Sequence, residues 1–322
     1  MANSSLRTIP VGTELHGVIV RGHGLYYDVA VDGSEGEILR CTLRGMLKRG
    51  RRRTDPAAVG DRVRATMTTP ETPESDPPEG VIEEIMPRVR ALSRVARGTQ
   101  DVEQVIVANP DQLVAVFAIH EPEPHPRLID RFLLIAEARG LASIICFNKA
   151  DLATDGDVEK LAEPYVPAGY PIVTTSVRTG AGIEELKGML AGKISAFAGP
   201  SGVGKSSLLN AIAPERAAER TGEVSQATGK GRHTTTWTTL FRVAPDTWVA
   251  DTPGIRALRV WGVKPDELDR LYPEFRPHLG ECYYADCRHM NEPGCAILAA
   301  VEASEIHPAR YASYRSFVEN DE

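Results

Sequence analysis

Two short motifs in the chain carry residue types that bind nucleotides. The first, GPSGVGKS at residues 199–206, fits G-x-x-x-x-G-K-[ST] between an apolar run and a helical stretch. Glycines in such a loop let backbone N–H groups turn toward phosphate oxygens, and the helix start adds a partial positive charge. Lys205 is expected to reach the β and γ phosphates in a catalytic role, and the Ser206 hydroxyl is expected to bind Mg²⁺. The predicted phosphate contacts are Gly199, Pro200, Ser201, Gly202, Val203, Gly204, Lys205, Ser206 and Ser207.

The second motif, NKAD at residues 148–151, indicates which base is bound. Asp151 is expected to accept two hydrogen bonds from the N1–H and N2 amino groups of guanine, a donor pair that adenine lacks. Lys149 is expected to pack along the ring, and Asn148 to tie the loops together. The predicted ligand is therefore GTP, and an ATPase is disfavoured. The predicted base contacts are Asn148, Lys149, Ala150 and Asp151, with Thr175 and Ser176 covering the guanine O6.

The sequence DTPG at residues 251–254 supplies further phosphate and metal contacts. Asp251 is expected at the tip of a strand, where it would bind Mg²⁺, and the Gly254 amide is expected to contact the γ phosphate. The next residue, often a glutamine that orients the attacking water, is Ile255 here. A different group must therefore position the water.

His233 is the nearest candidate for that catalytic role, because it adjoins threonines that are expected to supply a magnesium ligand. A surface role for this histidine is the alternative. By comparison with related loops, Thr235 is the predicted ligand and Thr234 the alternative.

Three of the five cysteines gather with a histidine in one segment, with the spacing C-x4-C-x-H-x5-C. A Cys₃His set suits tetrahedral Zn²⁺ with no open position, so it predicts one structural zinc rather than a catalytic metal. Scattered buried cysteines with a surface histidine are the alternative. The predicted ligands are Cys282, Cys287, His289 and Cys295, whereas Cys41 and Cys146 are expected to be core residues.

The elements that must position these residues fall into three predicted parts. Short alternating runs in residues 1–90 predict a five-stranded OB-type β-barrel that binds RNA, with a loop at residues 69–80. Apolar strands alternating with helices in residues 91–262 predict an α/β GTPase domain with a mostly parallel sheet, entered through a linker at residues 88–109. Residues 263–322 predict a helical zinc module. Because the guanine motif precedes the phosphate loop, the GTPase domain is predicted to be circularly permuted.

Composition limits the functional classes further. The chain has 322 residues and a net charge of -7, which argues against indiscriminate nucleic-acid binding. A basic run crosses residues 40–53 without an acidic residue, and inside a barrel it predicts RNA contacts at Arg49, Arg51, Arg52 and Arg53. A solvated loop is the alternative. No apolar run approaches the roughly 20 residues that span a bilayer, and the amino terminus lacks a secretory pattern. We expect a cytoplasmic protein that is not membrane-bound.

The chain as a whole resembles the bacterial small ribosomal subunit-dependent GTPase A family. The shared elements are NKAD, GPSGVGKSS, GKGRHTTT at residues 229–236, DTPG, and CYYADCRHMNEPGC at residues 282–295. The resemblance implies a GTPase, stimulated by the small ribosomal subunit, that binds the subunit and its rRNA late in assembly and leaves after hydrolysis. We expect it to be monomeric when free. An RNA-binding assembly factor that uses GTP mainly as a conformational ligand is the alternative.

Overall fold

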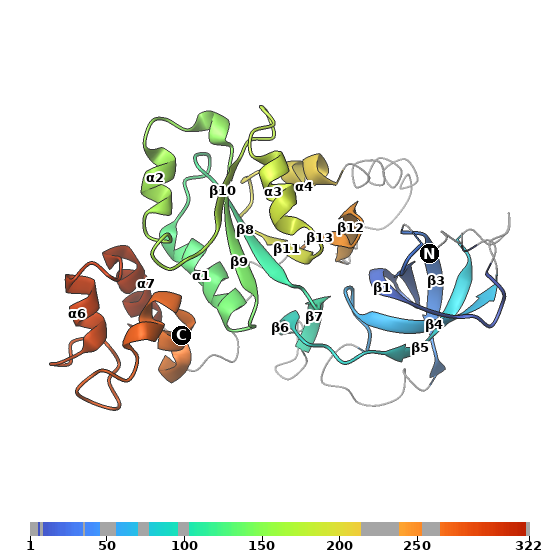
Figure 1. Cartoon of the computed structure of the whole chain (residues 1–322), viewed down its shortest axis with the longest axis horizontal. Helices are drawn as coiled ribbons and strands as arrows, with labels where there is room; N and C mark the ends of the chain where they lie inside the picture. Colours follow the sequence, from blue (N-terminus) through green and yellow to red (C-terminus); the bar gives the residue numbers. More distant parts are fainter. Residues whose placement is uncertain are drawn as a thin grey trace, which may run out of the picture. The chain divides into compact units, whose positions relative to one another are not determined.

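The computed structural model describes residues 6, 9–34, 36–45, 56–69, 77–95, 103–213, 238–252 and 265–319 (Figure 1). Its internal contacts divide the chain into two compact units, and each is described by itself. The first unit consists of Met1–Asp111, Lys187–Phe197 and Leu209–Ala257, and the second of Gln112–Leu186, Ala198–Leu208 and Leu258–Glu322.

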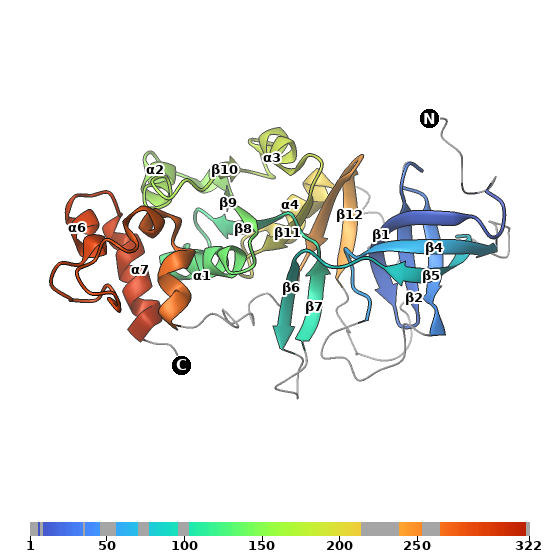
Figure 2. The ribbon, with the colours of Figure 1, turned by 60° about the horizontal axis from the view of Figure 1, so that its bottom comes forward.

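The amino-terminal part of the first unit is a closed five-stranded barrel, which confirms the predicted barrel fold (Figure 2). Its strands pair in the order β1-β2-β3-β5-β4. Alternate residues of β3 (Leu39, Cys41 and Leu43) are buried while those between them are half-buried, because successive side chains of a strand point to opposite faces. The loop predicted at residues 69–80 ends at residue 78, two residues earlier than expected, because β5 begins at Glu79. The strand bounds are β1 (Glu14–His23), β2 (Tyr26–Val31), β3 (Ile38–Leu43), β4 (Arg62–Thr69) and β5 (Glu79–Ile85).

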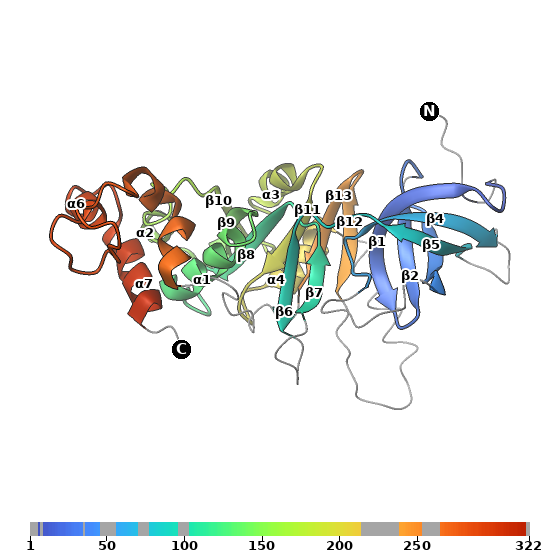
Figure 3. The same cartoon turned by 90° about the horizontal axis from the view of Figure 1, so that it is seen from below.

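The predicted linker at residues 88–109 is wrong, because this segment forms an antiparallel pair of strands, β6 (Ala91–Val95) and β7 (Glu103–Ala108) (Figure 3). A contact distant in sequence explains the pair. The Ala108 N–H donates to the Val59 carbonyl at 2.7 Å. A Cβ on Gly60 would lie 2.0 Å from the Ala108 carbonyl oxygen, so the strand packs directly on that turn.

The α/β region contains a six-stranded sheet with the order β10-β9-β8-β11-β13-β12. The pairs β8–β9, β9–β10 and β11–β13 are parallel. Edge strand β12 is antiparallel to β13 and was not predicted, whereas the mostly parallel sheet is confirmed. Every residue of β8 is buried, as is typical of strands inside parallel sheets. The strand bounds are β8 (Gln112–Ala118), β9 (Ala142–Asn148), β10 (Ile172–Thr175), β11 (Ile194–Ala198), β12 (Thr239–Ala244) and β13 (Thr247–Asp251).

Four α-helices of this region lie where the sequence predicts them, and one of the four, α2, is shorter than predicted. Helix α2 stops at Ala162 rather than at residue 168, because Pro164 and Pro167 have no backbone N–H to donate to the preceding helical turn. Helix α1 turns an apolar face inward, with Phe132 and Leu133 buried, and also buries Asp130. The helix bounds are α1 (Pro126–Glu137), α2 (Asp157–Ala162), α3 (Ile183–Leu190) and α4 (Lys205–Ile212), with a short 3₁₀ turn η3 (Ala150–Leu152).

The carboxy-terminal module is helical, as predicted, although its first helix is 3₁₀ rather than α. Tyr272 and Phe275 stack in its core, and Tyr314 packs edge-on against both rings. Buried Arg310 of α7 donates to Glu274 at 2.6 Å and to Asp130 of α1, which joins the module to α1. The bounds are η5 (Pro265–Leu271), η6 (Pro273–His278), α6 (Ala296–Glu302) and α7 (Pro308–Glu319). Within the described ranges, no helix is long and apolar enough to cross a bilayer.

Candidate nucleotide and metal sites

The phosphate loop lies between β11 and α4, and two of its glycines are required by close contacts with neighbouring strands. A Cβ on Gly199 would lie 2.2 Å from the Val116 carbonyl oxygen of β8. Gly204 has a φ of +83°, and a Cβ there would lie 2.6 Å from the Asn148 amide nitrogen. A larger residue at either position would therefore displace the loop, so the glycines fix where its backbone N–H groups can meet phosphate.

Asn148 joins the base-reading motif to the phosphate loop, as the sequence predicts. Its Nδ2 donates to the Val203 carbonyl at 2.8 Å, and its Oδ1 accepts a hydrogen bond from Thr175 Oγ1 at 3.0 Å. Asn148 is only 2% exposed. The Cys146 thiol lies 3.4 Å from Thr175 Oγ1, and burial raises its pKa to about 12, so this cysteine is an inert core residue. This buried chain of hydrogen bonds, from Cys146 through Thr175 and Asn148 to Val203, fixes the positions of β9, β10 and the phosphate loop relative to one another.

Two neighbouring side chains position the Asp151 carboxylate and favour its ionised form, which is a hydrogen-bond acceptor. Ser176 Oγ donates to its Oδ1 at 2.5 Å, and Arg178 Nε lies 2.7 Å from its Oδ2. These contacts, the Ser176 hydrogen bond most of all, lower the pKa of Asp151 below its ordinary value. An ionised carboxylate accepts hydrogen bonds only, which suits the two donors on the guanine edge. Arg178 was not predicted, and no local motif marks it.

Lys149 adopts a left-handed backbone conformation, with a φ of +61°, at the start of the η3 turn. Its Nζ donates to the carbonyl oxygen of Glu121, in the segment between β8 and α1. Glu121 is itself left-handed, with a φ of +54°, which is uncommon for a residue with a side chain. The lysine is thus anchored to a segment distant in sequence, and that anchor was not predicted.

Asp251 is the last residue of β13 and pairs in register with Phe197 of β11. The hydroxyl of Thr252 donates to the Phe197 carbonyl at 2.6 Å, so the end of β13 is fixed to the strand that enters the phosphate loop. Ser206 is exposed at the start of α4. A carboxylate and a hydroxyl are ligand types that Mg²⁺ accepts. The predicted residues His233, Thr234, Thr235, Gly254 and Ile255 lie outside the described residues.

The predicted Cys₃His ligands converge. One ligand atom from each of the four residues lies within 4.8 Å of the others. The Sγ atoms of Cys282 and Cys295 are 4.0 Å apart, and His289 Nδ1 lies 3.5 and 3.4 Å from them. Three sulfur atoms and one ring nitrogen at these separations fit a tetrahedral metal site. The cluster can therefore hold a metal ion.

Residues around the cluster orient its histidine and its loop. His289 Nε2 lies 3.4 Å from Asp269 Oδ2, which leaves Nδ1 facing the sulfur atoms. Such carboxylate partners commonly fix the orientation of metal-binding histidines. The Tyr311 hydroxyl donates to the His289 carbonyl at 2.8 Å, and the Tyr314 hydroxyl to the Arg288 carbonyl at 2.9 Å. Asp269 was missed, because nothing in the cysteine spacing points to it.

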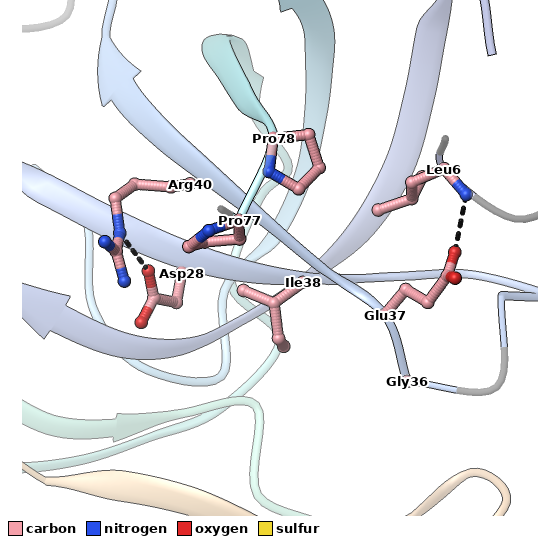
Figure 4. Close-up of a pocket in the computed structure, with 8 residues that line it drawn as sticks. All are labelled: Leu6, Asp28, Gly36, Glu37, Ile38, Arg40, Pro77 and Pro78. Atoms are coloured by element: carbon pink, nitrogen blue, oxygen red, sulfur yellow. Dashed lines mark hydrogen bonds and ion pairs between the residues drawn. The ribbon is translucent and has the colours of Figure 1, made fainter. Parts of the chain in front are cut away.

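The basic run is described only in part. Arg40 Nε lies 3.0 Å from Asp28 Oδ1 beside a hollow of about 410 Å³ on the barrel, bordered by Pro77 and Pro78 (Figure 4). Arg44 pairs with Glu83. These two arginines are thus paired with carboxylates. The predicted RNA contacts Arg49, Arg51, Arg52 and Arg53 lie outside the described residues.

A family model described as RsgA GTPase matches residues 85–261, and one described as RsgA N-terminal domain matches residues 16–72. The chain belongs to the RsgA family. Its relatives include "Small ribosomal subunit biogenesis GTPase RsgA" of Gemmatimonas aurantiaca, 43% identical over 94% of this chain and 96% of that protein. The protein of the same name from Moorella thermoacetica is also 43% identical, with the same coverage of both chains.

Solved structures agree with this RsgA assignment. YjeQ from Thermotoga maritima is 35% identical, with a TM-score of 0.74, over 95% of this chain and 98% of that one. YloQ, described as a circularly permuted GTPase, is 29% identical, with a TM-score of 0.73, over 95% of this chain and 94% of that one. The predicted permutation is confirmed. As a member of the RsgA GTPase family, the chain is a GTP-hydrolysing enzyme.

Proposed function

We propose that this enzyme couples GTP hydrolysis to late maturation of the small ribosomal subunit and to its own release from that subunit. The main support is the name of its relatives, small ribosomal subunit biogenesis GTPase. The match to these relatives covers nearly the whole length of both chains. The Asn148 bridge supports the GTP part, because it joins a base-reading motif to a phosphate loop in one buried network. Hydrolysis would then provide the signal for release.

Each nucleotide contact has a proposed role. Asp151 reads guanine and Lys149 packs along the base, while Thr175 and Ser176 cover O6. Lys205 and the other residues of the phosphate loop bind the phosphates, as does the Gly254 amide. Mg²⁺ is bound by Ser206, Asp251 and Thr235, with Thr234 as the alternative to Thr235. His233 positions the attacking water.

The other modules supply binding and stability. The Cys₃His cluster holds one structural Zn²⁺, since it has four protein ligands and no open position. The barrel contacts rRNA through Arg49, Arg51, Arg52 and Arg53, because OB-folds bind nucleic acids through their loops. The free protein is a cytoplasmic monomer that does not bind membranes. With these assignments, the proposed protein binds rRNA while GTP is bound.

Small ribosomal subunits should accelerate GTP hydrolysis by this enzyme, because the isolated chain lacks the usual water-orienting glutamine. Steady-state phosphate release with and without purified subunits measures the effect, with large ribosomal subunits as the control partner. A rate unchanged by small subunits, with binding retained, would instead favour the factor that uses GTP mainly as a conformational ligand.

Asp151→Asn should weaken GTP binding by about tenfold to a hundredfold and increase affinity for xanthosine triphosphate. The asparagine amide can donate to the oxygen that xanthine carries in place of the guanine amino group. Competition binding with the two nucleotides measures the change. Asp155→Asn is the matched control, since Asp155 is an exposed carboxylate of the same segment. An unaltered base preference in Asp151→Asn would rule out its role in reading guanine.

A further inference from the structure

The segment between β8 and α1 contains a histidine that bridges two carboxylates beside the anchor of Lys149. His120 Nδ1 lies 2.6 Å from Glu123 Oε1, and its Nε2 lies 2.9 Å from Asp157 Oδ2. Glu123 belongs to the same segment, whereas Asp157 begins α2, beyond the guanine motif in sequence. The bridge therefore connects the segment that anchors Lys149 with the segment that follows Asp151.

Asp157 is well placed to hold the second segment. Its Oδ2 accepts hydrogen bonds from both the backbone N–H and the hydroxyl of Thr154, each at 2.7 Å. The Asp157 N–H donates in return to the Thr154 carbonyl at 3.2 Å. These reciprocal hydrogen bonds hold the turn between η3 and α2. His120 therefore contacts a carboxylate whose position is already fixed by Thr154.

The residue next to His120 needs such support. Glu121 has a φ of +54°, and a residue with a side chain is held in this left-handed region only when its surroundings impose it. Its carbonyl oxygen accepts the hydrogen bond from Lys149 Nζ. If the segment relaxed, that carbonyl would turn away, and Lys149 would lose the contact that directs its side chain.

We propose that His120 is a positioning residue for guanine-nucleotide binding, which acts by holding the Glu121 carbonyl where it orients Lys149. This inference rests on the proposed packing of Lys149 against the base. His120 does not touch the nucleotide in this role. It sets the geometry of the lysine by tying both segments that flank the guanine motif to each other.

His120→Ala should raise the dissociation constant for GDP roughly threefold to tenfold, as expected for loss of partly exposed charge-assisted contacts. Fluorescent GDP titration of the full chain measures it. His23→Ala is the matched control, since His23 also pairs with an aspartate, Asp28 at 3.0 Å, but belongs to the barrel. Circular dichroism and thermal melting check that each variant is folded. A His120→Ala affinity equal to that of the parent protein would overturn the proposal.

A double-mutant cycle with Lys149→Ala separates positioning from general destabilisation. Lys149→Ala alone must weaken GDP binding, and failure of that step would refute the proposed role of Lys149 itself. Where it does weaken binding, adding His120→Ala to Lys149→Ala should cause little further loss. A full, additive loss in the double variant would mean that His120 acts without Lys149, and would contradict the proposal.

The pH dependence gives an independent measurement. The Asp157 and Glu123 contacts raise the pKa of His120 above its ordinary value of 6.5. The charged groups facing its ring are Glu123 from its own segment and Asp157 from α2, with Lys149 one residue removed at the Glu121 carbonyl. Only the protonated ring donates to both carboxylates, so the bridge is complete at low pH and loses a donor as pH rises through the raised pKa. GDP affinity should therefore fall above pH 6.5 more steeply in the parent protein than in His120→Ala, and parallel profiles would contradict this.

Discussion

Cys287→Ser should loosen the carboxy-terminal helical module while leaving GTP binding largely intact. A structural zinc ion in a small site contributes on the order of 10 kcal/mol to folding of its surroundings. All four ligands lie in the segment between η6 and α6, which has little regular secondary structure of its own. Loss of one ligand should therefore release this segment first. The phosphate loop and guanine motif lie elsewhere in the chain and keep their own buried network.

Three measurements test this prediction. Metal analysis of the purified parent protein should find about one zinc per chain, and hydrogen exchange should show lost protection in residues 265–319 of Cys287→Ser. GDP titration should remain close to that of the parent protein. Cys41→Ser is the control, because Cys41 is a buried barrel thiol outside the cluster and its loss should not change the zinc content. Carefully prepared protein without zinc would contradict the assignment.

The parts of the fold that the sequence predicted are those whose pattern is local. The apolar run of β8 reflects a strand that is buried on both faces. The alternation in β3 reflects a strand that is buried on one face. The β6–β7 pair could not be predicted in the same way, because it depends on the contact of Ala108 with the turn at Gly60. The early end of α2 was different, since Pro164 and Pro167, which lack a backbone N–H, already signalled it in the sequence.

The candidate site divides in the same way. The phosphate loop and the Cys₃His ligands each lie in one segment, so spacing alone identified them. Supporting residues come from distant segments instead: Asp269, beside the zinc-ligand candidate His289, lies 20 residues from it, and Asp157 lies 37 residues from His120, the proposed support of Lys149. No local period links such pairs. The supports of a site therefore become visible only when the chain is folded, whereas its direct ligands are visible in the sequence.

His233→Ala should retain GTP binding and small-subunit binding but lose most of the subunit-stimulated rate of hydrolysis. Ile255 stands where a glutamine often orients the attacking water, so another group must take that role. His233 adjoins the threonines proposed to bind Mg²⁺, and a positioning or acid–base group typically contributes about 10² to 10⁴-fold. We propose that His233 reaches the attacking water only when the subunit is bound, so the slow basal rate should change little in His233→Ala.

Single-turnover phosphate release with saturating small subunits measures this loss, and cosedimentation with a non-hydrolysable GTP analogue checks subunit binding. His16→Ala is the control, since His16 is an exposed histidine of β1 that the mechanism does not use. The expected pattern is a large loss in His233→Ala alone, at unchanged affinity for both ligands. Stimulation that survives intact in His233→Ala would mean that a different group orients the water, and a group supplied by the subunit itself would then be the next candidate, because the stimulation depends on that partner.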